Sequence, residues 1–183
     1  SSAALSSMTG VTVIDGIDVV NDNDLSRLRA NLGNIDIDIL INNAGVLTEE
    51  TLGKIDYSQV ERQFRVNAIG PLNTVEKLLG LLHKGTKVVL ISSRMGSISD
   101  NSSGGSYGYR MSKAALNAAG VSLANDLKPQ GIAVGLLHPG FVKTTLVDNQ
   151  GDIDTTEAAR RLKQQIDEQT TASYTHRTLP TKR

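Results

Sequence analysis

The 183-residue sequence contains no cysteine, and this absence excludes disulfide bonds and thiolate chemistry. Histidine is scarce: His83, His138 and His176 are too scattered to suggest a zinc cluster, and we expect no metal site. No apolar run approaches the roughly 20 residues that span a bilayer, and the N-terminal stretch SSAALSSMTG lacks the regions of a signal peptide. We therefore expect neither a membrane segment nor a targeting segment, and a cytoplasmic location.

Neither sign of charge is in excess. The 19 basic and 19 acidic side chains leave a formal net charge of zero, so the chain has no electrostatic signature for nucleic acid or an anionic membrane. A hydrophobic content of 39% and a charged content of 21% are typical of a soluble globular protein. The length fits one domain, and no repeat or linker divides it. We expect a single domain over residues 1–183 that acts on a small molecule.

What the sequence does contain is an alternation of strand-like and helix-like segments. Four apolar runs are predicted to be strands: VTVIDGIDV at 11–19, IDILINNAG at 37–45, TKVVLISS at 86–93 and IAVGLLHPG at 132–140. Four segments are predicted to be helices: 21–33, 57–82 with a bend at Pro71, 108–127 and 154–170. The tail 172–183 has no clear periodicity. Apolar strands separated by helices predict an α/β fold with a doubly wound, Rossmann-like parallel sheet, in three α/β/α layers.

Polar side chains gather where these strands end, and in open α/β sheets ligands bind there. The ends read Asn42-Asn43-Ala44-Gly45, Ser92-Ser93-Arg94-Met95-Gly96 and HPGFVKTT from His138. On the helix at 108–127, Tyr109 and Lys113 are four residues apart, so their side chains share one face. Each motif alone also fits an ordinary turn, loop or chance spacing. Their occurrence in one order favours a catalytic site.

This order resembles the short-chain dehydrogenase/reductase family over roughly residues 11–147. The family motifs Asn-Asn-Ala-Gly, Ser, Tyr-x-x-x-Lys and Pro-Gly all match. The residues around these motifs are most similar to those of the sniffer- and C-factor-like carbonyl-reductase branch. The resemblance implies a reductase that uses NADP or NAD, with NADP favoured. It also implies a homo-oligomer, a homodimer or homotetramer, for the intact protein. The small alanine side chains along helix 108–127 would allow a second helix to approach closely, and the alternative is that they pack only on the protein's own sheet.

The resemblance also implies a role for individual residues. Tyr109 would donate a proton to a carbonyl, Ser93 would hydrogen-bond the carbonyl oxygen, Lys113 would hold the nicotinamide ribose, and Asn67 would anchor a proton-relay water. The residues that would contact the cofactor are Asp18 and Val19 beside the adenine, Asn43, Ala44 and Gly45 at the adenosine end, and Pro139, Gly140, Val142 and Thr144 near the nicotinamide or pyrophosphate, together with Tyr109 and Lys113.

Elementary chemistry agrees with these roles. A phenol has a pKa near 10, and a neighbouring ammonium together with an oxidised nicotinamide would favour the phenolate of Tyr109. Ser93 has no nearby histidine and no Gly-x-Ser-x-Gly elbow, so a serine hydrolase is the lesser alternative. Ser92 points the opposite way along its strand and is expected to be structural. Tyr107 is off the helix face that carries Tyr109 and is expected in a loop or a substrate contact.

The family's glycine-rich turn, Thr-Gly-x-x-x-Gly-x-Gly, is not found in the sequence, and the TG at 9–10 does not replace it. We therefore expect a first βαβ segment to be missing upstream of Ser1, and the C-terminal end to be atypical. Two hypotheses remain. The first is an NAD(P)-dependent reductase of a ketone, aldehyde or quinone. The second is a truncated, non-catalytic relative that acts as a binding or signalling protein, or a gene fragment.

Overall fold

The structure, a computed structural model, describes residues 3–169 and 175–177. Its main elements, in chain order, are α1 (Ala3–Ser6), α2 (Asp22–Leu32), β1 (Ile37–Asn42), α3 (Tyr57–Phe64), a π-helical turn (Arg65–Ile69), α4 (Gly70–Leu78), β2 (Leu82–Ile91), α5 (Tyr107–Leu127), β3 (Ala133–Leu137), α6 (Thr155–Asp167) and β4 (Thr175–Arg177). Short 3₁₀ turns follow α4, β2, α5 and β3, at Leu79–Leu81, Arg94–Gly96, Lys128–Gln130 and Thr145–Val147.

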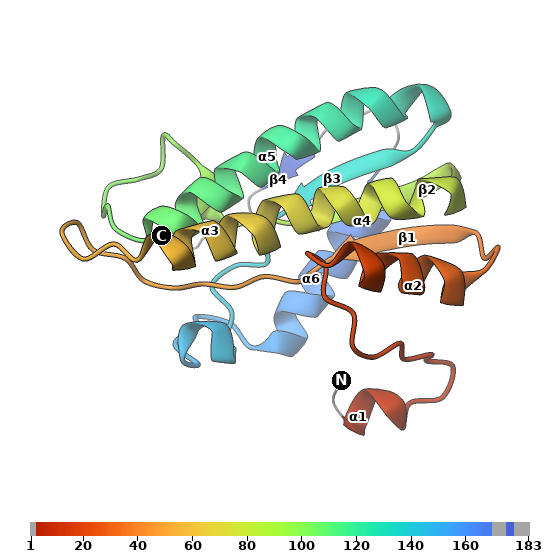
Figure 1. Ribbon diagram of the computed structural model, residues 1–183, viewed down its shortest axis with the longest axis horizontal. Helices are drawn as coiled ribbons and strands as arrows, with labels where there is room; N and C mark the ends of the chain where they lie inside the picture. The colour runs from red at the N-terminus through yellow and green to blue at the C-terminus, as the bar shows by residue number, and fades with distance from the viewer. Residues whose placement is uncertain (1–2, 170–174, 178–183) are drawn as a thin grey trace.

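The strands form one parallel sheet in the order β1-β2-β3-β4. Leu40 of β1 lies opposite Val88 of β2, and Val88 lies opposite Val134 of β3. Each connection between parallel strands crosses from one end of the sheet to the other, and helices make these crossovers. Figure 1 shows α3, α4 and α5 in front of the sheet and α6 behind it.

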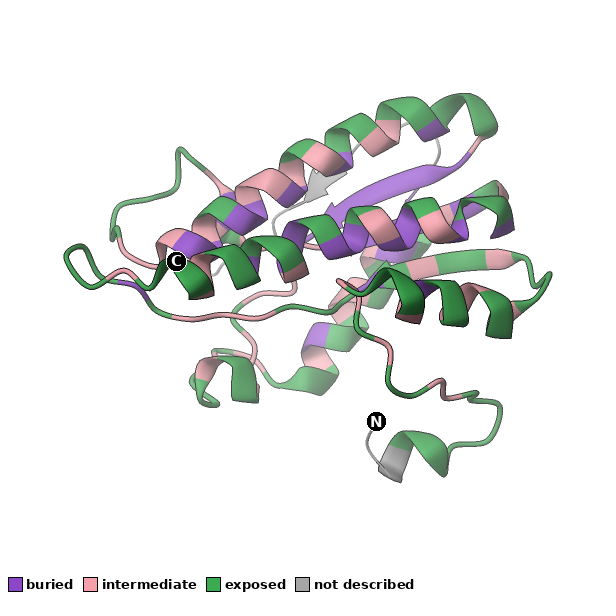
Figure 2. Ribbon diagram, in the orientation of Figure 1, coloured by how far each residue is buried: buried purple, intermediate pink, exposed green. Residues whose placement is uncertain are grey.

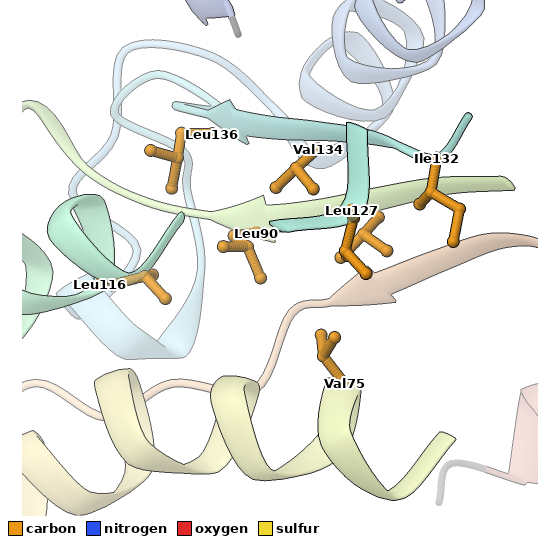
Figure 3. Close-up of a cluster of buried hydrophobic side chains, with 8 residues drawn as sticks. Val75, Leu90, Leu116, Leu127, Ile132, Val134 and Leu136 are labelled. Carbon is orange, nitrogen blue, oxygen red and sulfur yellow. The ribbon is translucent and has the colours of Figure 1, made fainter. Parts of the chain in front are cut away.

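Alternate residues of β2 and β3 face the two sides of this sheet. On one side, Val88, Leu90, Val134 and Leu136 pack with side chains of α4 and α5 in the larger core, part of which Figure 3 shows. On the other side, Val89 and Leu137 pack against Ile166 of α6. Strand β3 is buried along its whole length (Figure 2). These two cores confirm the predicted α/β fold with helices on both faces of a parallel sheet.

The predicted strand at 11–19 is wrong. Residues 11–20 have no ladder partner, and they lead from the small helix α1 to α2 (Figure 1). An apolar run becomes a strand only when another strand pairs with it, and within the described residues β1 pairs with β2 alone. In the tail, β4 appears where no periodicity suggested a strand, and the rest of 172–183 lies outside the described residues. The described helices include none that is long and apolar enough to cross a membrane.

The predicted bent helix at 57–82 is present from Tyr57 to Leu81, whereas Leu82 belongs to β2, and Pro71 is not the main irregularity of the helix. The helix widens at Arg65–Ile69, where the Gly70 N–H donates to the Arg65 carbonyl five residues earlier. Pro71 then stands in the first turn of α4, where a missing N–H costs least. The π-helical turn contains Asn67, and such turns are frequent at functional sites.

Candidate active site

Helix α5 places Tyr109 and Lys113 together, as the spacing predicts. Both are buried, at 8% and 4% exposed, and the Lys113 Nζ lies 5.7 Å from the centre of the Tyr109 ring. The ammonium donates to the Ile91 carbonyl at the end of β2, at 2.8 Å. Helix α5 is thereby fixed to the carboxyl end of a central strand.

The pKa of Tyr109 differs from our expectation. Burial raises the pKa of this phenol above its ordinary value of 10, and a hydrogen bond with Ser93 opposes the rise. The Lys113 Nζ is directed to the Ile91 carbonyl, and burial lowers the pKa of Lys113 itself to about 8. In this structure Tyr109 is therefore a protonated, neutral phenol at pH 7, the form that can donate a proton.

The two serines after β2 have different surroundings. Ser93 caps the 3₁₀ turn Arg94–Gly96 by accepting from the Met95 N–H at 3.2 Å, and it is half-buried. The Ser93 hydroxyl also forms a hydrogen bond with the Tyr109 side chain. Ser92 is buried and donates to the Asn117 side chain at 2.6 Å. Ser92 thus ties β2 to α5, which agrees with a structural role.

Asn67 is fully buried in the π-helical turn, and its side chain is completely engaged. The side-chain oxygen accepts from the Val46 N–H, and the amide donates to the Val46 carbonyl and to the Ser112 hydroxyl, at 2.8, 2.8 and 3.0 Å. Its backbone carbonyl has lost the usual partner four residues later, because that residue is Pro71 and has no N–H. The role of Asn67 as the anchor of a proton-relay water stays a prediction.

A cleft of about 990 Å³ opens beside this cluster. Four predicted cofactor residues line it: Asp18, Val19, Ala44 and Gly45. A Cβ at Gly45 would lie 3.4 Å from the Asn67 side-chain oxygen and 3.9 Å from the Lys113 Nζ, so glycine keeps open the space that joins the cleft to Lys113. The residues that line this cleft fit the adenosine half of a dinucleotide.

The other predicted cofactor residues lie outside the lining of this cleft. Asn43 is exposed beside it, and Tyr109 and Lys113 lie on α5. The remaining four residues follow β3: Pro139, Gly140, Val142 and Thr144. Gly140 has a φ of +93°, which glycine adopts without strain. Val142 forms a bridge with Ile153. The structure therefore groups Asn67, Ser93, Tyr109 and Lys113, and leaves the nicotinamide contacts after β3 as a prediction.

Sequence reasoning missed one wall of the cleft. It comes from α3 and the turn after it, and consists of Ser58, Glu61, Arg62, Arg65 and Val66. The available signal was their spacing of three and four residues, which places Ser58, Glu61, Arg62 and Arg65 on one side of a helix that leads to Asn67.

The sequence profile of the short chain dehydrogenases matches residues 17–155, which is most of the chain and includes every grouped residue. The chain belongs to this family. The family assignment agrees with the motifs in the sequence and with the parallel sheet.

Two proteins of similar sequence are each 42% identical to the chain. A 1-hydroxy-2-glutathionyl-2-methyl-3-butene dehydrogenase from Rhodococcus sp. (strain AD45) is 42% identical over 139 residues, which cover 75% of this chain and 62% of that protein. The C-signal protein of Myxococcus xanthus is 42% identical over 134 residues, which cover 72% of this chain and 81% of that protein. The chain thus spans less than two thirds of the dehydrogenase and most of the C-signal protein.

Solved structures of the family share the fold closely. The carbonyl reductase Sniffer of D. melanogaster superposes with a TM-score of 0.84 at 28% identity, covering 91% of this chain and 74% of that one. A short-chain dehydrogenase/reductase from Burkholderia multivorans with bound NADP gives a TM-score of 0.83 at 27% identity, covering 92% of this chain and 74% of that one. These neighbours agree with the carbonyl-reductase branch that the sequence wording indicated.

Proposed function

We propose that the protein is an NAD(P)-dependent oxidoreductase that reduces a ketone, aldehyde or quinone carbonyl to an alcohol. The observation that carries the proposal is the buried Tyr109 phenol, protonated at pH 7, with the Ser93 hydroxyl as its hydrogen-bond partner. A carbonyl oxygen placed between these two hydroxyls would receive hydrogen bonds from both, and the proton of Tyr109 would pass to the oxygen as it gains negative charge.

The nicotinamide cofactor, NADP or NAD, supplies the hydride when it is bound. Asp18, Val19, Ala44 and Gly45 would hold its adenosine half in the cleft, and Lys113 would hold the ribose beside Tyr109. The lysine pKa of about 8 leaves it mostly charged at pH 7 and able to donate hydrogen bonds to ribose hydroxyls. Support for NADP comes from the Burkholderia neighbour, whose structure contains it.

Replacing Tyr109 with phenylalanine tests the proposal, because it removes only the hydroxyl. In a version of the protein that carries a family-type glycine-rich segment upstream of Ser1, we expect Tyr109→Phe to lower kcat for carbonyl reduction by about 10²–10⁴-fold. NADPH affinity, measured by calorimetry, should stay within about twofold, because the phenol is expected to act on the substrate. The matched control is Tyr57→Phe at a tyrosine that is 75% exposed. Equal turnover by the two variants would reject the catalytic assignment.

A second candidate is a non-catalytic binding or signalling protein. The observation that favours it is the C-signal relative, 81% of whose length the chain covers. This alternative expects a biological effect that does not depend on the phenol. A signalling effect retained in full by Tyr109→Phe, in a protein without measurable turnover, would support it over the reductase.

We also propose that the protein forms a homo-oligomer through the outer face of α3, α4 and α5. Large apolar side chains are exposed there, at 39–55%: Phe64, Leu72, Met111 and Val121. On α5, Ala118 is exposed between Met111 and Val121 and would let a second helix approach closely. A second copy of this chain is the proposed occupant.

A further inference from the structure

Glu50 is a buried carboxylate with no part in the proposed chemistry. It lies between β1 and α3 and is 3% exposed. A buried carboxylate is costly unless hydrogen bonds compensate it. Within residues 3–169 no lysine or arginine pairs with it, so its stabilisation comes from neutral donors.

These donors come from three separate segments. One carboxylate oxygen accepts from the Gln63 amide on α3 at 2.6 Å and from the Thr48 hydroxyl at 2.7 Å. The other accepts from the Gly108 N–H at 2.9 Å. The Glu50 backbone carbonyl also accepts from the Ser106 N–H at 2.9 Å. Glu50 therefore joins the segment after β1 to α3 and to the first turn of α5.

The first turn of α5 has no local cap. Ser106 stands at the N-cap position with a φ of 47°, in the left-handed region, and its side chain makes no capping hydrogen bond. The N–H groups of a first helical turn need partners and favour negative charge. Glu50, distant in sequence, supplies both to Gly108, the residue that precedes Tyr109.

The side chains around the contact between Glu50 and Gly108 are tightly packed. A Cβ at Gly108 would lie 2.4 Å from the Gln63 side-chain nitrogen and 2.9 Å from the Val60 Cα, so α5 and α3 touch at this point. Gln63 is itself oriented, because its oxygen accepts from the Thr48 N–H at 3.0 Å. A displacement of the Glu50 carboxylate would therefore move the start of α5.

We propose that Glu50 is a positioning residue: its carboxylate fixes the first turn of α5 and thereby the direction of the Tyr109 phenol. This inference rests on the proposed function for its effect on turnover. Glutamine cannot replace Glu50, because its NH₂ group would face a donor in either orientation, the Gly108 N–H in one and the Gln63 amide in the other. Misplacement of a reacting group by about 1 Å can cost about 100-fold in rate.

The experiment compares Glu50→Gln with Glu49→Gln, its exposed neighbour, in the version with the upstream segment. We expect Glu50→Gln to lower kcat for carbonyl reduction by about tenfold to 100-fold, with the KM for the carbonyl and the calorimetric NADPH affinity within about threefold. In a Tyr109→Phe background, Glu50→Gln should lower the residual rate by less than about twofold, because the group that it positions is gone.

Three results would overturn the assignment: equal kcat in the two glutamine variants, a parallel loss of NADPH affinity, or an undiminished effect in the Tyr109→Phe background. If Glu50→Gln does not fold, Thr48→Val removes one of the three side-chain bonds. It also removes the hydrogen bond that the Thr48 hydroxyl accepts from the Gln63 amide at 2.7 Å. It should lower kcat by at least about threefold, and an unchanged kcat would overturn the assignment.

The proposed function and the positioning role can fail separately. A parent protein without carbonyl turnover contradicts the proposed function. The role of Glu50 is then tested by hydrogen exchange, in which Glu50→Gln should speed exchange of the first-turn amides of α5 by about tenfold and leave those of α6 unchanged. Unchanged exchange in the first turn of α5 would contradict the positioning role alone.

Discussion

Tyr109 and Lys113 are both buried, and burial favours the uncharged form of each side chain. For the phenol this raises the pKa, so the proton remains available for transfer at pH 7. For the ammonium it lowers the pKa to about 8, so holding the charge at pH 7 costs free energy. Stability and the proposed ribose-binding role therefore oppose each other at Lys113.

Lys113→Met should stabilise the fold at pH 7. A pKa that falls from 10.5 in the unfolded chain to about 8 in the fold corresponds to about 3 kcal/mol, from which about 1 kcal/mol is subtracted for the lost bond to the Ile91 carbonyl. Between pH 8 and 10.5 the unfolded chain binds more protons, so the free energy of unfolding of the parent rises with pH there. In urea unfolding, the free energy of unfolding of Lys113→Met should exceed that of the parent by about 2 kcal/mol at pH 7, and it should not exceed it at pH 10.5.

The control for this measurement is Lys54→Met at an exposed lysine. Its effect on the free energy of unfolding should be the same at both pH values. A Lys113→Met variant that is less stable than the parent at pH 7 would show that the buried ammonium is stabilised by more than the Ile91 carbonyl.

At the scale of elements, local patterns predicted much of the fold. Periodicity and cap residues, which are properties of neighbouring residues, predicted three helices and three strands of the structure. These are the helices at 22–32, 107–127 and 155–167 and the strands β1, β2 and β3. The strand expected at 11–19 failed, because pairing depends on a distant segment. The π-helical turn was missed, although the spacing of five residues between Phe64 and Ile69 departs from the three-and-four spacing of an α-helix.

The same distinction applies to the site. Tyr109 and Lys113 were paired from their spacing within one helix, and Ser93 was predicted from the motif that follows its strand. Glu50 and Gln63 were not predicted, because their contact with Gly108 joins segments that no short motif connects. Helix spacing could have singled out Gln63, which stands four residues before Asn67.

Gly96→Ala should disturb the packing of α5 against the 3₁₀ turn after β2. A Cβ at Gly96 would lie 2.8–2.9 Å from the backbone and Cβ of Lys113, none of which is a flexible end. We expect a loss of about 1–3 kcal/mol in the free energy of unfolding, measured with urea. The matched control is Gly80→Ala, where a Cβ meets nothing within 4 Å. Equal stability of the two variants would mean that α5 can shift without cost.

The outer helix face yields a prediction about assembly. Leu72 and Val121 are about 40% exposed on the face proposed to meet a second copy, so Leu72→Glu with Val121→Glu should give a monomer in light scattering at micromolar concentration. Leu146→Glu, at an equally exposed leucine in the turn after β3, should leave the parent's mass unchanged. A parent protein that is already monomeric would reject the homo-oligomer.

At the scale of the whole molecule, the outer edge of β1 affects how residues 1–183 are expected to behave by themselves, because this edge is open to association with other chains. Ile39 and Ile41 are about half exposed along this strand, and within the described residues no strand pairs with that edge. Unpaired edges with apolar side chains favour association between chains. The cleft beside β1 also lacks a glycine-rich turn to supply N–H groups to a pyrophosphate.

Residues 1–183 alone should therefore bind NADPH weakly and reduce carbonyls poorly. We expect calorimetry to give an affinity at least about 100-fold below that of a version with an upstream strand, glycine-rich turn and helix, because the pyrophosphate contacts are missing. Micromolar NADPH binding and turnover by the short chain would show that the cleft at Asp18 and Gly45 is sufficient.

The strand order β1-β2-β3-β4 is also the order in which a ribosome releases the strands. Each new strand pairs with the strand made just before it, so translation never requires insertion between two strands already in place. Tyr109 and Lys113 emerge before β3, but α5 packs through Leu116 on a core that includes Leu136 of β3. The direct partners of the two side chains, Ser93 and the Ile91 carbonyl, leave the ribosome earlier still, so the emergence of β3 completes the core beneath α5 and not the side-chain contacts themselves.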